Sequence, residues 1–496
     1  MRGILDRIAQ QASADPRRLA LLEDDLQLDY GELQQAVSRV AASLDAARVA
    51  VLMDNGCAWA VVDLAIATRG AVAIPVPPFF SAAQIAHLVA DAAPDLIVSD
   101  RPDAIAALTG LSPAGRLDVA GRELSLFTPA VPAAPALPAG TCKITYTSGT
   151  TGQPKGVCLS GEAIEATALA LAEAVQAGPT DRSLSLLPLS TLLENIGGVY
   201  VPLCSGSSAA LPSLARCGFS GSSAVQPALL LTAFHRFAPS ATILVPQLLK
   251  LLVECLTAGA QLPHTLRFVA LGGAPCAKPL IQRAWALGLP VYEGYGLSEA
   301  ASVVCLNRPG RQRPGSVGTP LPGLHVRLAA DHEIMVSGRL FEGYLGLDAE
   351  VPAEWATGDL GRFDEDGYLY VTGRKKTAYA TAFGRNVSPE WVESELTATP
   401  MLMQAAVFGE GRARNVAVLV AQPTADISRI AEAVAAANAR LPDYARVGAW
   451  LLADAPFTAA NGLARASGMP DRDAIGRHYG QVLESLYASE SPTVDP

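Results

Sequence analysis

The chain has 496 residues, of which 37 are Lys or Arg and 47 are Asp or Glu, so its formal net charge is −10. Half of the residues are apolar and 17% are charged, which argues against a disordered chain and for one long enough to bury more than one core. The acidic balance and the lack of any Lys/Arg cluster exclude nucleic acid as an expected partner. Only six of the basic residues are lysine, at positions 143, 155, 250, 278, 375 and 376.

Cysteines and apolar stretches indicate the compartment. The eight cysteines form no C-x-x-C pair and stand in apolar stretches, a pattern typical of reduced, buried thiols in a cytoplasmic protein. Residues 1–7 carry charges where a signal peptide needs an apolar run. The longest uncharged segment, 195–215, is interrupted by Gly and Pro. We therefore expect a buried wall there rather than a transmembrane segment, and a soluble protein.

Helix-like and strand-like patterns alternate along the first 100 residues. Asp29 and Glu32 form a capping box that predicts a helix running to about Leu44. Three short apolar stretches are typical of buried strands: 49–53, 71–76 and 95–98. This alternation predicts an α/β fold with a largely parallel sheet. The Pro/Ala-rich stretch 129–140 is predicted to be a linker.

The most informative segment runs from residue 144 to residue 157. An apolar strand leads into small or hydroxylated residues and then into Lys155, the small residues being Thr147, Ser148, Gly149, Thr150, Thr151 and Gly152. Small side chains let backbone N–H groups approach an anion, hydroxyls add donors, and the lysine adds positive charge. The segment is not a Walker P-loop, because Gly156 rather than Ser or Thr follows Lys155. Taken alone, such a loop is more often a plain surface turn.

Later segments add further polar and glycine-rich turns. Leu-Gly-Gly-Ala-Pro occupies 271–275, Tyr-Glu-Gly-Tyr-Gly-Leu-Ser-Glu occupies 292–299, Thr-Gly-Asp occupies 357–359, and Gly-Arg-Lys-Lys occupies 373–376. The Gly294-Tyr295-Gly296 triplet is a weak dinucleotide-type signal, and Glu299 stands where a third glycine would be needed. A Rossmann dinucleotide site is therefore excluded.

Together, and in this order, these segments resemble the motifs of the adenylate-forming superfamily, which comprises acyl-CoA synthetases, the adenylation domains of peptide synthetases, and luciferases. The resemblance implies an α/β fold: a large N-terminal adenylate-forming domain of mixed β-sheets and helices (1–375) and a small mobile C-terminal α+β lid domain (376–490). A disordered tail (491–496) is expected to follow. It also implies ATP and Mg²⁺ as cofactors, with CoA or phosphopantetheine as the thiol.

The resemblance further assigns roles to residues. It implies Lys155, Glu299 and the hinge residue Lys376 as catalytic, and Thr147 with Glu299 as the Mg²⁺ ligands, whose hard oxygens suit that ion. The implied cofactor-binding residues are Thr147, Ser148, Gly149, Thr150, Thr151, Gly152, Gly273, Ala274, Pro275, Glu293, Gly294, Tyr295, Gly296, Ser298, Asp359, Arg374 and Gly384. Among these, Asp359 and Arg374 are the implied ribose contacts. Gly384 is implied to let the pantetheine arm pass close to the backbone.

The region around residue 376 has its own signals. Asp366-Gly367 is a hairpin signal between 361–363 and 368–371. Beyond it, 390–396 has a helical pattern and 416–420 a strand pattern. About 120 residues with such patterns are enough for a small second domain.

The chain departs from the superfamily at its C-terminal lysine. That lysine is implied to bridge the carboxylate and the α-phosphate during adenylation, but Met469 stands in its place and no lysine follows Lys376. Losing one charge-stabilising donor typically lowers a rate by about 10²–10³. Three explanations stay open: Arg465 or Arg472 substitutes, adenylation is slow while thioester formation survives, or the nucleotide site binds without full catalysis. The second is favoured.

The resemblance places the acid pocket between 188–201, 272–276 and 296–304. These stretches are apolar and rich in small residues, which favours a fatty or aryl carboxylic acid over a polar one, although plain core packing explains the same residues as well. Glu194 is not interpreted as an anchor for an amino acid's ammonium group. The predicted activity is an acid–thiol ligase that hands its acyl group to CoA or an acyl carrier protein. The alternatives are an adenylate-binding protein without turnover, or an enzyme with a hydroxyl or amine acceptor that forms a β-lactone or an amide.

Overall fold

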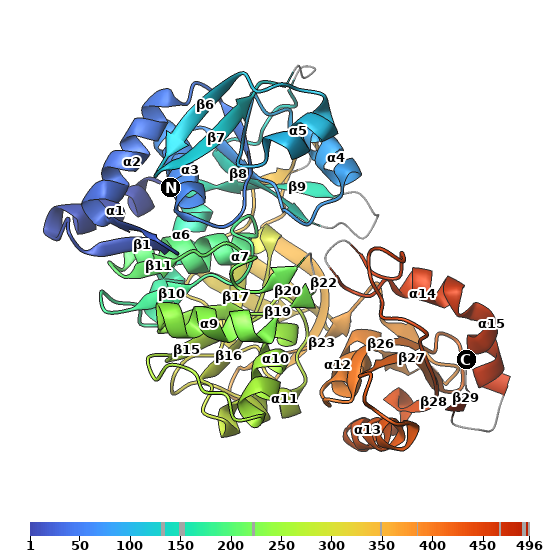
Figure 1. Ribbon diagram of the computed structural model, residues 1–496. Helices are drawn as coiled ribbons and strands as arrows, with labels where there is room; N and C mark the ends of the chain where they lie inside the picture. Colours follow the sequence, from blue (N-terminus) through green and yellow to red (C-terminus); the bar gives the residue numbers. More distant parts are fainter. Residues whose placement is uncertain are drawn as a thin grey trace.

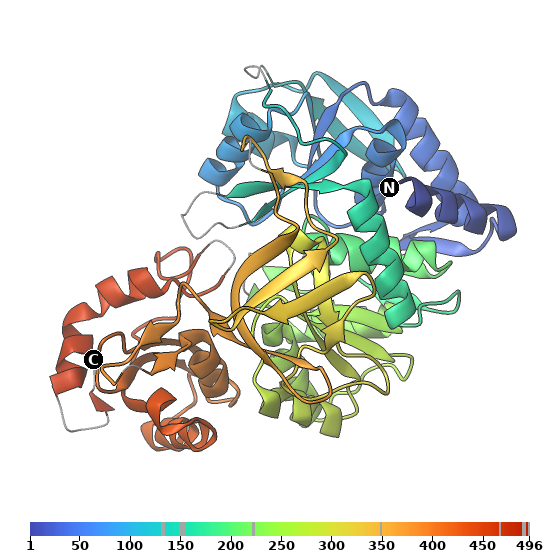
Figure 2. The same cartoon turned by 180° about the vertical axis from the view of Figure 1, so that it is seen from behind.

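The computed structural model describes residues 1–129, 134–147, 154–220, 224–347, 350–383, 385–465, 468–488 and 493–494. A large N-terminal domain is followed by a smaller C-terminal one that packs against its side, drawn from orange to red (Figures 1 and 2). The predicted α/β fold with two unequal domains is confirmed. The domain boundary at 375/376 and the mobility of the smaller domain stay predictions.

One sheet carries the first predicted strands. Its described strands, in spatial order, are β21 (Gly343–Tyr344), β9 (Lys155–Ser160), β8 (Thr141–Thr147), β4 (Val72–Pro75), β3 (Arg48–Leu52), β5 (Leu96–Ser99), β7 (Arg122–Phe127) and β6 (Gly115–Val119). The three short strands predicted from apolar runs are β3, β4 and β5, and β3 pairs in parallel with both of the others. These strands are parallel as predicted, but the sheet is mixed rather than largely parallel, because its outer pairings are antiparallel.

A second large sheet forms the floor of the cavity described below. In spatial order its described strands are β18 (Thr319–Pro320), β17 (Ser302–Leu306), β16 (Val291–Leu297), β15 (Phe268–Leu271), β14 (Ala241–Leu244), β10 (Arg182–Leu184), β11 (Ser208–Ala210), β1 (Leu19–Glu23) and β2 (Leu26–Asp29). The strands β10, β14, β15 and β16 run parallel to one another. In parallel strands the carboxyl ends meet at one edge, where α/β proteins bind ligands.

A third sheet leads to the smaller domain. It consists of β19 (Leu324–Leu328), β20 (Glu333–Gly338), β22 (Glu354–Phe363) and β23 (Leu369–Arg374). The strands β22 and β23 are antiparallel and joined at Asp364-Gly367, so the predicted hairpin is confirmed. Two short antiparallel pairs stand apart from these sheets. One is β12 (Phe219–Ser220) with β13 (Ala224–Val225), and the other, after Lys376, is β24 (Tyr379–Ala380) with β25 (Asn386–Val387).

The helices of the large domain lie against these sheets (Figure 1). They are α1 (Arg2–Ala14), α2 (Tyr30–Ser43), α3 (Cys57–Arg69), α4 (Ala82–Ala92), α5 (Pro102–Thr109), α6 (Gly161–Ala174), α7 (Leu192–Glu194), the π-helix η1 (Asn195–Tyr200), α8 (Val201–Cys204), α9 (Pro227–Phe237), α10 (Pro246–Thr257), α11 (Lys278–Ala286) and the 3₁₀ turn η2 (Ser298–Ala300). The predicted capping box is present, since the Asp29 side chain accepts from Glu32 N and the Glu32 side chain accepts from Asp29 N. Helix α2 ends one residue before the predicted Leu44.

The smaller domain packs helices on a sheet of its own. The described sheet is β26 (Leu402–Phe408), β27 (Asn415–Ala421), β28 (Val447–Leu452) and β29 (Thr493–Val494). Its helices are α12 (Pro389–Thr397), α13 (Ile427–Arg440), η3 (Asp443–Ala445), α14 (Arg472–His478) and α15 (Gly480–Ala488). The helix predicted at 390–396 and the strand predicted at 416–420 are thus confirmed as α12 and β27.

The tail predicted to be disordered, 491–496, contains a short described strand, and its disorder stays a prediction. Thr493 and Val494 pair in parallel with Trp450 and Leu451 of β28. A sheet edge offers unpaired backbone N–H and C=O groups, and a following extended segment can satisfy them. Residues 491, 492, 495 and 496 lie outside the described residues, as do residues 130–133 of the predicted linker.

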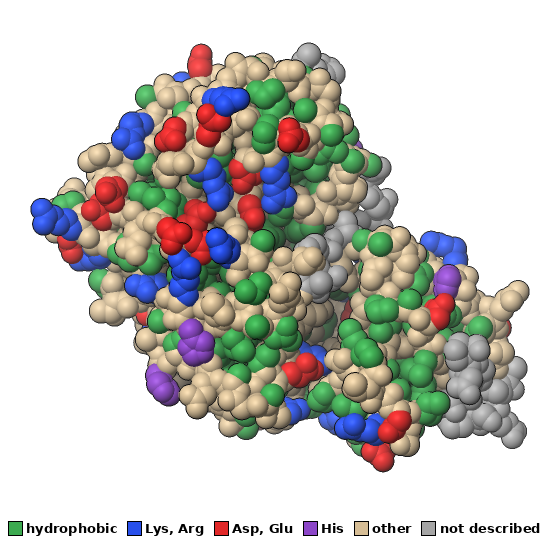
Figure 3. All heavy atoms as spheres, in the orientation of Figure 1, with side chains coloured by type: hydrophobic (Ala, Val, Ile, Leu, Met, Phe, Trp, Pro, Cys, Tyr) green, Lys and Arg blue, Asp and Glu red, His purple; other side chains and the backbone are tan. Residues whose placement is uncertain are grey.

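The cysteine side chains are free thiols, and the charged side chains on the surface are mixed in sign. All eight cysteines are free, and five of them are buried, as predicted for thiols in apolar stretches. In the ranges that the structure describes, no helix has both the length and the apolar character that crossing a membrane requires. Figure 3 shows acidic and basic side chains interspersed over the region of β1, β6 and β7, where Arg122 of β7 pairs with Glu23 of β1 at 2.8 Å. The sign of the charge is therefore mixed on this face.

Candidate active site

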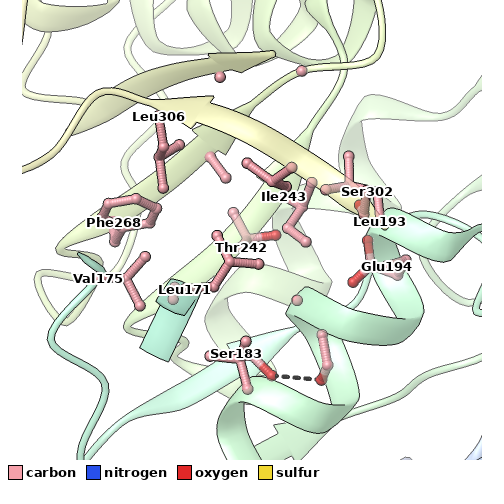
Figure 4. Close-up of a pocket in the computed structure, with 18 of the residues that line it drawn as sticks. Leu171, Val175, Ser183, Leu193, Glu194, Thr242, Ile243, Phe268, Ser302 and Leu306 are labelled. Atoms are coloured by element: carbon pink, nitrogen blue, oxygen red, sulfur yellow. Dashed lines mark hydrogen bonds between the residues drawn. The ribbon is translucent and has the colours of Figure 1, made fainter. Parts of the chain in front are cut away.

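A cavity of about 300 Å³ lies against one face of the second large sheet. It extends from the starts of the parallel strands, at Ala241 and Phe268, to their carboxyl ends, at Leu271. Its wall is largely apolar and comes from α6, β10, the α7–η1–α8 segment, β14, β15, β16 and β17 (Figure 4). The described lining residues lie between Leu171 and Leu306, so none of them belongs to the smaller domain. The structure brings parts of all three predicted pocket segments together here, including Gly197, Gly272 and Gly296.

Glycines shape the side of the cavity next to the superfamily motifs. At Gly296 a β-carbon would lie 1.6 Å from the backbone oxygen of Ser302, so only glycine allows β16 and β17 to approach this closely. At Gly273 the backbone has a φ of 82°, in the left-handed region that favours glycine. Gly272 follows β15 directly, Gly273 comes next, and Ala274 and Pro275 continue the turn before α11. These glycines thus lie where the sequence motifs predicted close contact with a ligand.

Three residues predicted from separate motifs meet beside this edge. Asp359 of β22 and Arg374 of β23 are register partners, and Arg374 Nε lies 3.0 Å from Asp359 Oδ1. The hydroxyl of Tyr295 donates to Asp359 Oδ2 at 2.7 Å. Burial raises the pKa of Asp359, and Arg374 and the Tyr295 hydrogen bond oppose that shift. A carboxylate has room for further hydrogen bonds, so the arrangement fits a ligand with two neighbouring hydroxyls.

Glu299 and Lys155 meet through a residue that the sequence did not single out. The hydroxyl of Tyr344 donates to Glu299 Oε1 at 2.7 Å, and Lys155 Nζ lies 5.5 Å from the centre of the Tyr344 ring. Tyr344 is held there because β21 pairs with β9, where it lies opposite Val157. No local pattern marks Tyr344, since its place depends on pairing with a strand much earlier in the chain.

The predicted phosphate loop joins two paired strands. Thr147 ends β8, Lys155 begins β9, and the two are register partners in an antiparallel pair. The intervening predicted residues, Ser148, Gly149, Thr150, Thr151 and Gly152, lie outside the described residues, as does Gly384. The predicted strand–loop–strand arrangement is therefore confirmed at both ends of the loop.

The predicted Mg²⁺ ligands supply few protein donors. Glu299 supplies a carboxylate and Thr147 a hydroxyl, both hard oxygen donors. Among the described residues, no group of three or more His, Cys, Asp or Glu side chains gathers as a metal site would require. Such a sparse donor set suits Mg²⁺, which commonly keeps one or two protein carboxylates and takes its other ligands from phosphates and water.

Glu293 is placed differently from the other predicted residues. It lies in β16 opposite Leu271 of β15 and is buried, with Oε2 lacking a hydrogen-bond partner among the described residues. Burial raises the pKa of Glu293 to about 8. Gly294 and Ser298 lie on the cavity wall, on either side of Tyr295 and Gly296.

The C-terminal segment that is implied to carry the adenylation lysine contributes no described residue to the cavity wall. Met469 is 40% exposed, and its backbone oxygen accepts from Arg465 N at 2.8 Å. The Arg472 side chain is bound by two carboxylates, with Nη2 lying 2.7 and 2.9 Å from the two oxygens of Glu393 and Nη1 3.3 Å from Glu390. The Arg472 guanidinium is therefore bound by carboxylates within the smaller domain. Lys376, the predicted hinge, directly follows Lys375 at the end of β23.

The two-domain α/β architecture, with motif residues gathered at one edge of the sheet, defines an adenylate-forming fold. The family described as "AMP-binding enzyme" matches residues 8–345, and "AMP-binding enzyme C-terminal domain" matches residues 379–491. The chain belongs to the AMP-binding enzyme family, within the adenylate-forming superfamily.

Curated relatives are similar over most of their length. A long-chain-fatty-acid–CoA ligase, FadD15 of Mycobacterium bovis, is 29% identical over 452 residues, which cover 76% of this chain and 73% of the relative. A feruloyl-CoA synthase of an Amycolatopsis species is 30% identical over 434 residues, covering 81% of this chain and 84% of the relative.

Solved structures share the fold. The anthranilate CoA ligase AuaEII in complex with anthranoyl-AMP has a TM-score of 0.79 at 18% identity, over 97% of this chain and 98% of that one. The O-succinylbenzoate CoA synthetase MenE of Bacillus subtilis, in complex with ATP and magnesium ion, has a TM-score of 0.73 at 21% identity, over 94% and 98%. At these identities the comparison supports the architecture alone.

Proposed function

We propose that the protein activates a hydrophobic carboxylic acid, fatty or aryl, with ATP and transfers the acyl group to a pantetheine thiol of CoA or of an acyl carrier protein. The observation that carries this proposal is the apolar cavity, because Gly272, Gly273 and residues 294–298 form part of its wall. An acid bound there has its carboxylate beside the motif residues of the nucleotide site. The named activities of the relatives, fatty-acid–CoA ligase and feruloyl-CoA synthase, agree with it.

The chemistry assigns a task to each group of residues. A carboxylate oxygen attacks the α-phosphorus of ATP and pyrophosphate leaves; a thiol then attacks the acyl carbon of the adenylate and AMP leaves. Positioning and charge neutralisation do most of the catalysis in such transfers. In this proposal Asp359 and Arg374 hold the ribose, and Lys155 with the phosphate loop neutralises the phosphates. Mg²⁺, held by Glu299 and Thr147, would supply further positive charge there.

Met469 favours a restricted form of this function. The position implied for the adenylation lysine holds a thioether, and Arg472 is bound to Glu393 and Glu390. We propose that adenylation is slow, while thioester formation from a ready-made adenylate is not. The extreme case is a protein that binds adenylate without turnover.

Two reactions that start from different points test the proposal. Thioester formation is followed by mass spectrometry with CoA or a phosphopantetheinylated carrier protein, starting either from synthetic lauroyl- and cinnamoyl-AMP or from the acids with ATP and Mg²⁺. We expect at least one synthetic adenylate to give thioester at least about 10² times faster than the corresponding acid does with ATP and Mg²⁺. The proposal is contradicted if neither starting point gives thioester with either thiol. Products formed with both thiols omitted reveal a hydroxyl or amine acceptor instead.

A further inference from the structure

Two carboxyl groups that the reaction does not use line the cavity: Asp181, which pairs with Arg267, and Glu194. Glu194 ends α7, immediately before the π-helix η1, and its side chain has no exposed surface. It lines the cavity on the side of Leu193 and Ser302, across from Leu171 and Val175 (Figure 4). A buried carboxyl in an otherwise apolar wall is costly unless something satisfies it.

Only half of this carboxyl group is satisfied. Oε2 accepts a hydrogen bond from Leu187 N at 3.3 Å, while Oε1 has no partner within the described parts of the chain. The hydroxyl of Ser185 also has no partner within hydrogen-bonding distance there, although it lies near enough to Glu194 to lower the pKa of that carboxyl. A β-carbon at Gly198 would lie 2.4 Å from Glu194 Oε1 and 2.5 Å from Ser185 Oγ. Both free atoms therefore face the same cavity-lining glycine, whose missing side chain leaves them room.

Two neighbouring hydroxyls of the wall are already used in hydrogen bonds. The Thr242 hydroxyl donates to Leu184 O at 2.8 Å, and the Ser183 hydroxyl donates to Gly198 O at 3.1 Å. Glu194 thus differs from Thr242 and Ser183, because its Oε1 has no hydrogen-bond partner among the described residues. An apolar acyl chain alone would leave this atom unsatisfied.

Among the residues that the structure describes, no cation forms an ion pair with Glu194. Burial is the main cause that raises the pKa of Glu194 to about 8, the opposing contributions come from Ser185 and Leu187 N, and no Lys, Arg or His is among its causes. The carboxyl is therefore mostly protonated at neutral pH. In that form its free oxygen can exchange hydrogen bonds with an uncharged hydroxyl, whereas an ammonium group would require two buried charges.

We propose that Glu194 binds a hydroxyl group, alcoholic or phenolic, carried by the acyl part of the acid substrate. This rests on the proposed function, which it narrows from hydrophobic acids in general to hydroxylated ones. Sites built to hydrogen-bond a substrate hydroxyl discriminate strongly against the analogue that lacks it, because the polar group of the site is then left unpaired.

Matched pairs of acids test the assignment. The probes are 4-hydroxycinnamic against cinnamic acid, and 3- and 8-hydroxyoctanoic against octanoic acid, and binding is measured by calorimetry with AMP present so that no turnover is needed. We expect at least one hydroxylated acid to bind about tenfold more tightly than its parent or better. Glu194→Leu should remove this preference, and Glu194→Gln, which keeps shape and hydrogen bonding, should retain most of it.

Control variants and further probes separate the outcomes. Thr242→Val removes a cavity hydroxyl that is already bonded, so it should affect both members of a pair alike. The proposal is overturned if wild type binds both members of every pair equally, if no probe acid binds, if Glu194→Leu keeps the preference, or if 8-aminooctanoic acid binds more tightly than the hydroxylated acids. Thioester synthesis from the synthetic adenylates is scored separately, so its failure would count against the proposed function alone.

Discussion

At the scale of residues, two glutamates near the cavity differ in whether a hydrogen bond from a neighbouring side chain orients their carboxyl group. Glu299 accepts a hydrogen bond from Tyr344, whose ring also faces the Lys155 ammonium. A hydrogen bond of this kind fixes the direction of a carboxylate and so the direction in which it offers its other oxygen. Glu194 has no such partner for its Oε1 among the described residues, which leaves that atom available to a ligand.

Removing the Tyr344 hydroxyl should therefore weaken Mg²⁺ binding without removing a metal ligand. In Tyr344→Phe we expect the gain in ATP affinity that Mg²⁺ provides to fall about tenfold or more, as for other residues that orient metal ligands. Calorimetric titration of ATP with and without Mg²⁺ measures it. Tyr370→Phe is the matched control, because its hydroxyl donates to Asp364 in the hairpin turn at 3.2 Å. If the two variants gain equally from Mg²⁺, Tyr344 does not position Glu299.

Motifs predicted the residues of the site better than its contacts. Asp359, Arg374 and Tyr295 were each implied by a motif of the superfamily, and the structure brings them within hydrogen-bonding distance. Tyr344 and the free oxygen of Glu194 were missed, because neither follows from neighbours in sequence. The first depends on the pairing of β21 with β9, and the second on the space left by Gly198.

At the scale of elements, a buried polar cluster joins three segments behind the cavity wall. Lys143 Nζ of β8 donates to Asp63 of α3 at 2.8 Å and to the Tyr200 hydroxyl of η1 at 2.8 Å. Asn195, the first residue of η1, also contacts Lys143 and Asp63. The cluster holds both ends of the π-helix whose Gly197 and Gly198 line the cavity.

Breaking this cluster on one side should be costly. Lys143→Met leaves the Asp63 carboxylate buried without its cation, and we expect the free energy of unfolding to fall by about 3–5 kcal/mol. Adding Asp63→Leu removes the unpaired charge and should recover part of that loss. Denaturant unfolding measures both, with the exposed Lys278→Met as the control. Equal stability of the Lys143 and Lys278 variants would mean that the cluster does not hold the wall.

Elements with strong local signals were predicted well, and those set by distant contacts were not. The helix α2 follows from its capping box, and β3, β4 and β5 follow from short apolar runs. The uncharged segment 195–215 was predicted only as a buried wall; it forms η1, α8 and β11, with the helical part wound as a π-helix at its start. Nothing local predicts that winding, since its polar anchors lie in α3 and β8.

At the scale of the whole molecule, one lysine connects the two domains. Lys250 Nζ of α10 donates to the backbone oxygens of Thr397, Thr399 and Leu402 at 2.9, 2.9 and 2.5 Å, at the end of α12 and the start of β26. Figure 1 shows α10 and α12 on facing sides of the two domains. The domain rotation that the superfamily resemblance implies would have to break these three bonds.

The few lysines of the chain thus have distinct places. Lys143 holds the cavity wall, Lys155 begins the strand after the phosphate loop, Lys250 holds the smaller domain, and Lys375 pairs with Asp331 and Glu333. None follows Lys376. In the described structure the cavity wall receives no residue from the smaller domain, and Arg472 is bound elsewhere. Position 469 therefore lacks the lysine that the superfamily resemblance implies for adenylation.

The rate of ATP–pyrophosphate exchange in wild type and in Met469→Lys, over a panel of fatty, aryl and hydroxylated acids, shows whether Met469 slows adenylation. Because the lysine would restore a charge that stabilises the adenylation step, we expect exchange in Met469→Lys to be about 10²–10³ times faster than in wild type for the preferred acid. Met469→Leu, which keeps the apolar side chain, should behave as wild type does. Exchange in wild type as fast as in Met469→Lys would contradict the account.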